Sequence, residues 1–201
     1  MPRVGEKDMV NSSPHPTETH GQFSLQPDLL PAGVELRPLV SHRDARGSFT
    51  EIFRGSWRVG LDPVQWNFVE SRAGVLRGVH FHLRHGDYLV ILRGRASIGL
   101  CDLRPDSPTA GRAALVELRG DALSGLAVPP GVAHGFYFHE PSTHVYAVSH
   151  YWDLSDELGC RWDDPALEIP WPQQRAHISP RDEALPSLET LLGQLRAAWR
   201  G

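Results

Sequence analysis

The chain has 201 residues, of which 40% are hydrophobic, and a formal net charge of −4 at pH 7. This length is enough to bury the core of one domain, and the mixed charge argues against a general nucleic-acid-binding protein. No apolar run approaches the roughly 18 residues that cross a bilayer, and the first residues lack a secretory signal pattern. Two cysteines, Cys101 and Cys160, are too few for a disulfide framework. We therefore expect a cytoplasmic protein without nucleic-acid or membrane partners.

Residues 1–31 are rich in Pro, Ser, Thr and His and have no apolar period, which predicts a flexible N-terminal tail. Residues 32–201 are predicted to form a single domain. Short β-type runs separated by Gly and Pro are expected as strands at 34–36, 48–53, 64–69, 88–92, 96–100, 114–118, 125–128, 135–138 and 144–148. Many short strands at regular spacing predict an all-β antiparallel sandwich or barrel. Leucines at helical spacing over residues 187–200, after Pro186, predict one short C-terminal helix.

The most informative motif lies between Gly74 and Gly94. It reads as glycine, five residues, His80-x-His82, four residues, Asp87, six residues and glycine. Residues two apart in a strand face the same side, so His80 and His82 are expected to point together. Asp87 follows a short turn, and His134 follows the rigid turn Pro129-Pro-Gly131. Spacing and geometry predict a cupin-type jelly-roll barrel whose mouth gathers these side chains.

Such a cluster suits either of two chemistries. Imidazole and carboxylate groups can hold one divalent transition metal, with His80, His82, Asp87 and His134 as the ligand set. The same groups can instead transfer protons without a metal. The other histidines have no patterned partner and are expected to lie outside the site: His15, His20, His42, His85, His139, His144, His150 and His177.

Further motifs follow one another along residues 34–190. They are Asp44–Phe53, Gln65–Asn67, Gly74–Phe81, Asp102–Arg104 with Ser107–Thr109, Pro129–Phe136, Tyr146, Arg161–Pro165, Ile169–Pro172 and Ile178–Asp182. In this order they resemble the dTDP-4-dehydrorhamnose 3,5-epimerase family of cupin-fold sugar-nucleotide enzymes. The resemblance implies an epimerase or isomerase of a dTDP-linked 4-keto-6-deoxy sugar, which works by proton abstraction and reprotonation next to the ketone.

The resemblance also implies roles for particular residues. His80 matches the base, Asp182 its carboxylate partner and Tyr146 the acid on the opposite face of the sugar. Positions that hold the nucleotide diphosphate and sugar are matched by Arg46, Phe49, Glu51, Gln65, Asn67, Arg77 and His134, and Asp87 is expected to contact a sugar hydroxyl. No cofactor is implied. A homodimer is expected, in which an early strand of one subunit joins the sheet of its partner.

Two positions depart from the family pattern. The family usually has a lysine where this chain has Asp87, and it rarely has a histidine at the place of His82. Together the two changes rebuild the spacing of a metal-ligand set. Three interpretations therefore stay open: a metal-free epimerase, a metal-dependent cupin enzyme, and a sugar-nucleotide-binding cupin without catalysis.

Overall fold

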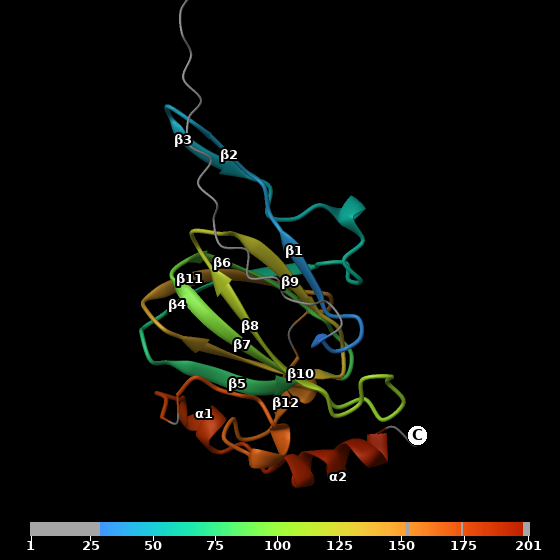
Figure 1. Ribbon diagram of the computed structural model, residues 1–201. Coiled ribbons are helices and arrows are strands. Elements are labelled where there is room, and N and C mark those ends of the chain that lie inside the picture. The colour runs from blue at the N-terminus through green and yellow to red at the C-terminus, as the bar shows by residue number, and fades with distance from the viewer. Residues whose placement is uncertain (1–28, 152, 174, 199–201) are drawn as a thin grey trace, which may run out of the picture.

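A computed structural model describes residues 29–151, 153–173 and 175–198 of the chain. Two five-stranded antiparallel sheets pack face to face as a sandwich (Figure 1). The first sheet has the order β1-β9-β6-β11-β4, and the second has the order β12-β5-β10-β7-β8. The strands of the first sheet are β1 (Glu35–Pro38), β4 (Gln65–Ser71), β6 (Asp87–Arg93), β9 (Ser124–Val128) and β11 (Ser142–Val148). Those of the second are β5 (Leu76–Phe81), β7 (Arg95–Asp102), β8 (Ala113–Arg119), β10 (Val132–Phe138) and β12 (Leu158–Gly159).

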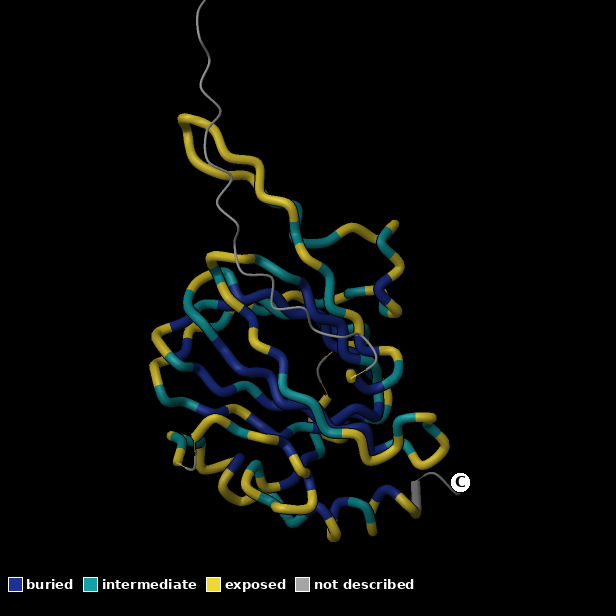
Figure 2. Tube along the Cα trace, viewed as in Figure 1, coloured by how far each residue is buried: buried dark blue, intermediate teal, exposed yellow. Residues whose placement is uncertain are grey.

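The inner faces of the two sheets form the main hydrophobic core (Figure 2). Leu89 and Ile91 of β6 meet Ile98 and Leu100 of β7, and Phe138 of β10 is fully buried beside them. Burial of alternating apolar residues between aligned sheets is what holds a β-sandwich together. The expected all-β jelly-roll class is therefore confirmed.

The outer face of the second sheet is covered by the C-terminal part of the chain (Figure 1). Helix α2 (Leu188–Ala198) buries Leu188, Leu191 and Leu195 against Val79 and Phe81 of β5. These leucines lie three and four residues apart, so they share one face of the helix. Because Val79 and Phe81 face α2, the alternate residues of β5 face the interior of the sandwich, as the sequence pattern predicts.

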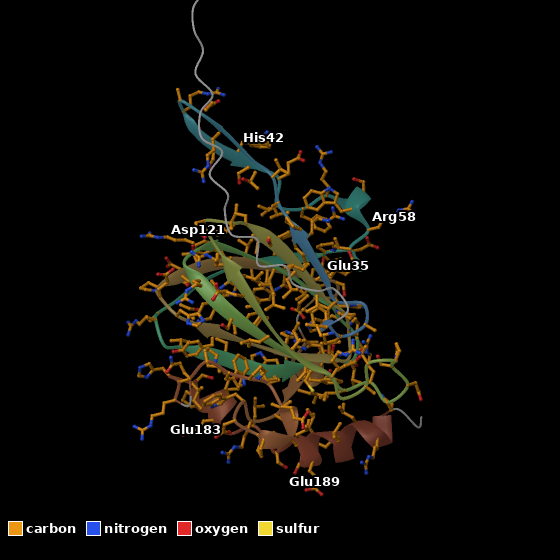
Figure 3. The ribbon with its side chains drawn as sticks, viewed as in Figure 1. Glu35, His42, Arg58, Asp121, Glu183 and Glu189 are labelled. Carbon is orange, nitrogen blue, oxygen red and sulfur yellow. The ribbon has the colours of Figure 1, made fainter. Side chains whose placement is uncertain are left out.

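A β-hairpin of β2 (Ser41–Asp44) and β3 (Gly47–Thr50) projects away from the two sheets, and Figure 3 shows His42 at this distant position. Its strands pair only with each other, and nearly all of its residues are exposed. The strand that we expected at 48–53 therefore ends earlier, at Thr50.

The outer face of the first sheet is apolar. The segment around the 3-10 helix η2 (Gly55–Trp57) covers part of it.

The burial of Leu30 also differs from expectation. This residue packs in the main core, although the sequence pattern places it in the tail. The rest of the predicted tail, residues 1–28, lies outside the described residues. Among the helices that are described, none is long and apolar enough to span a membrane.

Candidate active site

A cavity of about 240 Å³ lies between the two sheets. Strands of both sheets contribute side chains to it, and the segment around helix α1 (Pro180–Glu183) contributes others. The lining residues are Asn67, Val69, Arg77, His80, His82, His85, Asp87, His134, Phe136, His144, Tyr146, Val148, Glu157, Ser179, Arg181 and Asp182. Among the residues predicted from the sequence, the cavity therefore brings together His80, Asp182, Tyr146, Asn67, Arg77, His134, Asp87 and His82.

One wall of the cavity carries a histidine–carboxylate pair. Nε2 of His80, on β5, lies 2.8 Å from Oδ1 of Asp182 in α1. Ser179 caps this short helix by accepting the backbone N–H of Asp182, and Pro180 at the first helical position favours the turn. Burial is the largest single effect and disfavours the Asp182 carboxylate, but the hydrogen bond and charge of His80, together with hydrogen bonds from Gly78 and Ser179, hold the pKa of Asp182 below its usual value. The ionised carboxylate can only accept, so Nε2 of His80 donates and Nδ1 is left to take up a proton.

Tyr146 lies on the opposite sheet. It belongs to β11, where it pairs with Asn67 of β4 on one side and Leu89 of β6 on the other. Burial, and after it the nearby Asp87 carboxylate, raises the pKa of Tyr146 above its usual value. The phenol therefore keeps its proton at neutral pH. Because β5 and β11 belong to different sheets, His80 and Tyr146 reach the cavity from different walls.

A second cluster occupies the deeper part of the site around Asp87. The carboxylate oxygen Oδ2 of Asp87 lies 3.6 Å from Nε2 of His134, 3.9 Å from Nε2 of His82 and 3.9 Å from Nε2 of His85. All four residues are at least 95% buried. Strand pairing sets this geometry, because β10 aligns His134 with His80, and Asp87 begins β6 just after the turn that carries His82 and His85.

Burial dominates the protonation of this cluster. It lowers the pKa of His82 to about 4, with the neighbouring His134 acting in the same direction. It also lowers the pKa of His134 to about 4 and raises the pKa of Asp87. A buried charge costs free energy unless it is compensated, and these three groups are accordingly shifted towards their neutral forms.

His85 is a site residue that sequence reasoning missed. Its ring stacks on that of His82 at a centroid distance of 3.8 Å, and its Nδ1 lies 3.1 Å from Oδ2 of the buried Asp156. Asp156 also accepts the backbone N–H groups of Leu83 and Arg84, which fixes the turn before β6. The spacing of His85 from Asp87 was visible in the sequence, but its partner lies 71 residues away.

His144, Glu157 and Arg181 also line the cavity without having been predicted. The ring of His144 stacks between Phe136 and Phe138, and burial, with Arg77 second, lowers the pKa of His144 to about 4. Glu157 accepts a hydrogen bond from Arg181 at 2.8 Å. No local motif marks these residues, because each reaches the cavity through a long-range contact.

Four of the predicted substrate-binding residues lie elsewhere. Arg46 and Phe49 belong to the projecting hairpin, where Arg46 pairs with Asp44 at 2.6 Å and Phe49 is 64% exposed. Glu51 follows the hairpin and pairs with Arg54. Gln65 lies at the start of β4, where its side-chain amide donates to Oδ1 of Asn67 at 3.0 Å. None of these four residues lines the described cavity.

Comparisons with known proteins agree with this architecture. A family model described as dTDP-4-dehydrorhamnose 3,5-epimerase matches residues 31–190. A dTDP-4-dehydrorhamnose 3,5-epimerase of Sinorhizobium fredii is 36% identical over 157 residues, which cover 72% of this chain and 80% of the relative.

Solved structures of similar proteins hold dTDP-sugars. The epimerase RmlC from Legionella pneumophila, in complex with dTDP-4-keto-L-rhamnose, superposes with a TM-score of 0.76 and 30% identity, covering 81% of this chain and 92% of that one. ChmJ, a 3'-monoepimerase from Streptomyces bikiniensis in complex with dTDP-quinovose, gives a TM-score of 0.74 and 30% identity, covering 84% and 92%. The chain therefore belongs to the dTDP-4-dehydrorhamnose 3,5-epimerase family.

Proposed function

We propose that this protein epimerises a dTDP-linked 4-keto-6-deoxy sugar by removing and returning a proton at a carbon next to the ketone. The observation that carries the proposal is the placement of the His80–Asp182 pair and of Tyr146 on different walls of one cavity. Inversion of a carbon needs a base on one face and an acid on the other, which this placement supplies. Membership of the epimerase family supports the same reaction.

His80 is the base of the proposed reaction. Asp182 holds the Nε2–H tautomer, which leaves the lone pair of Nδ1 to accept the proton from the sugar carbon. The electron pair of the broken C–H bond moves towards the ketone and forms an enolate. The negative charge of Asp182 stabilises the imidazolium that results, which makes proton transfer to His80 more favourable.

Tyr146 is the acid. It donates its phenolic proton to the same carbon from the opposite face, and the enolate returns to the ketone with inverted configuration. Because burial raises the pKa of Tyr146, the phenol is protonated before the enolate forms. Before the next turnover, the proton that His80 has taken up passes to solvent, and the tyrosinate left at Tyr146 takes up a proton from solvent.

Arg77 and Asn67 are placed to hold the substrate inside the cavity. The guanidinium of Arg77 is oriented by Ser71, with Nε 3.0 Å from its hydroxyl, and a guanidinium binds phosphate oxygens well. The solved relatives named above hold dTDP-linked sugars. This supports a dTDP-linked substrate for the present chain.

In our proposal, Arg46 and Phe49 of the hairpin and Glu51 just after it serve the active site of a second subunit. Strand β4 is the edge of the first sheet and exposes Trp66 at 44% and Phe68 at 65%. An edge strand with apolar side chains offers hydrogen bonds and surface to a partner strand. In a homodimer the projecting hairpin of one copy can cover this edge in the other, beside Asn67 and the cavity.

We place the reaction in the cytoplasm. Cys101 and Cys160 are both buried and unpaired, as is usual for proteins of reducing compartments. The net charge of −4 argues against a nucleic-acid substrate, and Arg77 and Arg181 in the cavity suit a small anionic one.

The proposal is tested by incubating the protein in heavy water with a panel of nucleotide-linked 4-keto-6-deoxy sugars. Deuterium at C3, at C5 or at both carbons of a dTDP-linked substrate is expected, and the labelled carbon identifies which centre is inverted. The same sugars linked to UDP or GDP control for recognition of the nucleotide. Tight binding of the dTDP-sugar without any exchange would instead support a binding protein without catalysis.

A further inference from the structure

One carboxylate oxygen of Asp87, Oδ2, is buried without a hydrogen-bond partner. Within the part of the chain that the structure describes, Oδ2 of Asp87 is one of the few buried side-chain polar atoms that lack one. This oxygen lies 3.6 to 3.9 Å from the Nε2 atoms of His134, His82 and His85. Hydrogen bonds between such atoms measure roughly 2.7–3.2 Å, so none of the three rings donates to this oxygen. Burying a carboxyl group without compensation costs free energy, and a bound cation would supply that compensation.

The three imidazole rings turn their lone pairs towards this oxygen. Nδ1 of His82 lies 3.0 Å from the carbonyl oxygen of Asp156, and Nδ1 of His134 lies 3.2 Å from the carbonyl oxygen of Val132. Nδ1 of His85 lies 3.1 Å from the carboxylate of Asp156. Each of these partners is an acceptor, so each Nδ1 donates a proton, and a neutral ring then carries its lone pair on Nε2.

From this arrangement we propose that the protein binds one divalent transition-metal ion between His82, Asp87 and His134, with His85 beside these ligands. The ligand atoms of the first three residues lie within 4.8 Å of one another. Tetrahedral coordination with metal–nitrogen bonds of 2.0–2.1 Å separates its ligand atoms by about 3.4 Å, which is close to the separations around Asp87. A histidine whose Nδ1–H donates to a carbonyl or carboxylate is also the usual orientation of a metal ligand.

Asp156 belongs to the surroundings of this site rather than to its ligands. Its carboxylate already accepts from the backbone of Leu83 and Arg84 and from His85. It therefore orients His85, whereas the free oxygen of Asp87 faces the converging nitrogens. Imidazole nitrogens and a carboxylate are borderline ligands that suit Zn²⁺, Fe²⁺, Ni²⁺ or Mn²⁺.

The proposed metal leaves the base free. Nε2 of His80 is bonded to Asp182, and His80 is not part of the compact ligand group. Metal binding and proton abstraction by His80 are therefore compatible within one cavity. The binding of the ion does not depend on the proposed epimerase reaction, whereas its function does. In that reaction, a cation beside the ketone oxygen stabilises the negative charge of the enolate. Without a cation, an ionised Asp87 would disfavour that charge.

The test measures metal content and affinity in the full chain, produced without a histidine tag. After growth with added metals, elemental analysis of the purified protein is expected to find about one transition-metal ion per chain. Titration of chelator-treated protein with Co²⁺ is expected to give the visible absorption of a nitrogen- and oxygen-coordinated ion. Asp87→Asn and His134→Gln should weaken Co²⁺ binding by on the order of 100-fold, and Asp156→Asn by on the order of 10-fold.

Two control variants make the result specific. His80→Asn should retain the metal while losing deuterium exchange, and His150→Asn, at an exposed position, should retain both. Circular dichroism checks the fold of every variant, and a ligand variant that fails to fold is replaced by His82→Gln. Wild-type protein without metal and without the Co²⁺ spectrum would overturn the proposal, as would unchanged affinity in the folded ligand variants. A protein that binds metal but exchanges no deuterium would contradict the epimerase function and leave the metal site standing.

Discussion

Nε2 of His80 lies 2.8 Å from Oδ1 of Asp182, a residue 102 positions further along the chain. The carboxylate also accepts the backbone N–H of Gly78 at 3.4 Å, so it is bound to two points of β5. This relationship fixes both the orientation and the tautomer of the ring. It makes Asp182 a positioning residue for the base, which can be tested separately from the base itself.

Asp182→Asn keeps the shape of the side chain but removes its charge. We expect the rate of deuterium exchange to fall on the order of 100-fold, because the imidazolium formed on His80 loses its counter-charge. The loss should appear in kcat, with KM for the dTDP-sugar close to the wild-type value, because Asp182 acts on the ring of His80. A fall in kcat accompanied by an equal rise in KM would indicate a merely structural role for Asp182.

Tyr146→Phe separates the two proton transfers. The variant keeps His80 and Asp182, so it should still remove the proton and exchange it with solvent on the face of the base. Net inversion should fall by 100-fold or more, since the acid on the other face is missing. Nuclear magnetic resonance of the sugar distinguishes exchange with retention from inversion. Equal loss of both signals would contradict the assignment of Tyr146 as the acid.

His144 predicts a pH dependence of stability. Its pKa is lowered from 6.5 to about 4 in the folded protein, chiefly by burial. Between these values the unfolded chain binds a proton that the folded chain does not, so stability is lost as the pH falls from 6.5 to about 4. The contribution is about 3 kcal/mol.

The matching experiment uses His144→Phe, which preserves an aromatic ring between Phe136 and Phe138. Urea unfolding at pH 7 and pH 4.5 should show a smaller loss of unfolding free energy in this variant than in the wild type. His150→Gln, at an exposed position, should behave like the wild type. The same loss in all three proteins would mean that His144 does not carry the effect.

Mixed dimers test the role of the projecting hairpin. We expect Arg46→Ala and His80→Asn to be inactive as separate proteins. In a mixed dimer, the subunit with intact His80 receives an intact hairpin from the other subunit, so one active site is restored. The restored active site is measured as epimerase activity after the two variants are mixed under conditions that allow subunit exchange. Failure to recover activity, with mixed dimers present, would mean that the hairpin serves its own chain or no site at all.

The fold was largely predictable from sequence because its strands are short, regularly spaced and bounded by Gly and Pro. The spacing of the leucines in α2 likewise predicted a helix, and the structure packs these leucines on the second sheet. The position of Leu30 could not be predicted, because its burial depends on a core built from distant strands.

The site was predictable only where a local pattern or a resemblance marked the residues. His82, Asp87 and His134 stand in motifs, and the structure gathers them around one carboxylate oxygen. Asp182 lies in a helix of four residues, which no periodicity reveals. His85 faces the site because a turn packs against Asp156, a contact that spans 71 residues and leaves no local signal.

The measurement that tests the central claim most directly is deuterium incorporation from heavy water into a dTDP-linked 4-keto-6-deoxy sugar, compared between the wild type, His80→Asn and His150→Asn. We predict incorporation next to the ketone in the wild type and in His150→Asn, and a rate at least on the order of 1,000-fold lower in folded His80→Asn. Exchange by His80→Asn at the wild-type rate would contradict the assignment of His80 as the base and with it the mechanism.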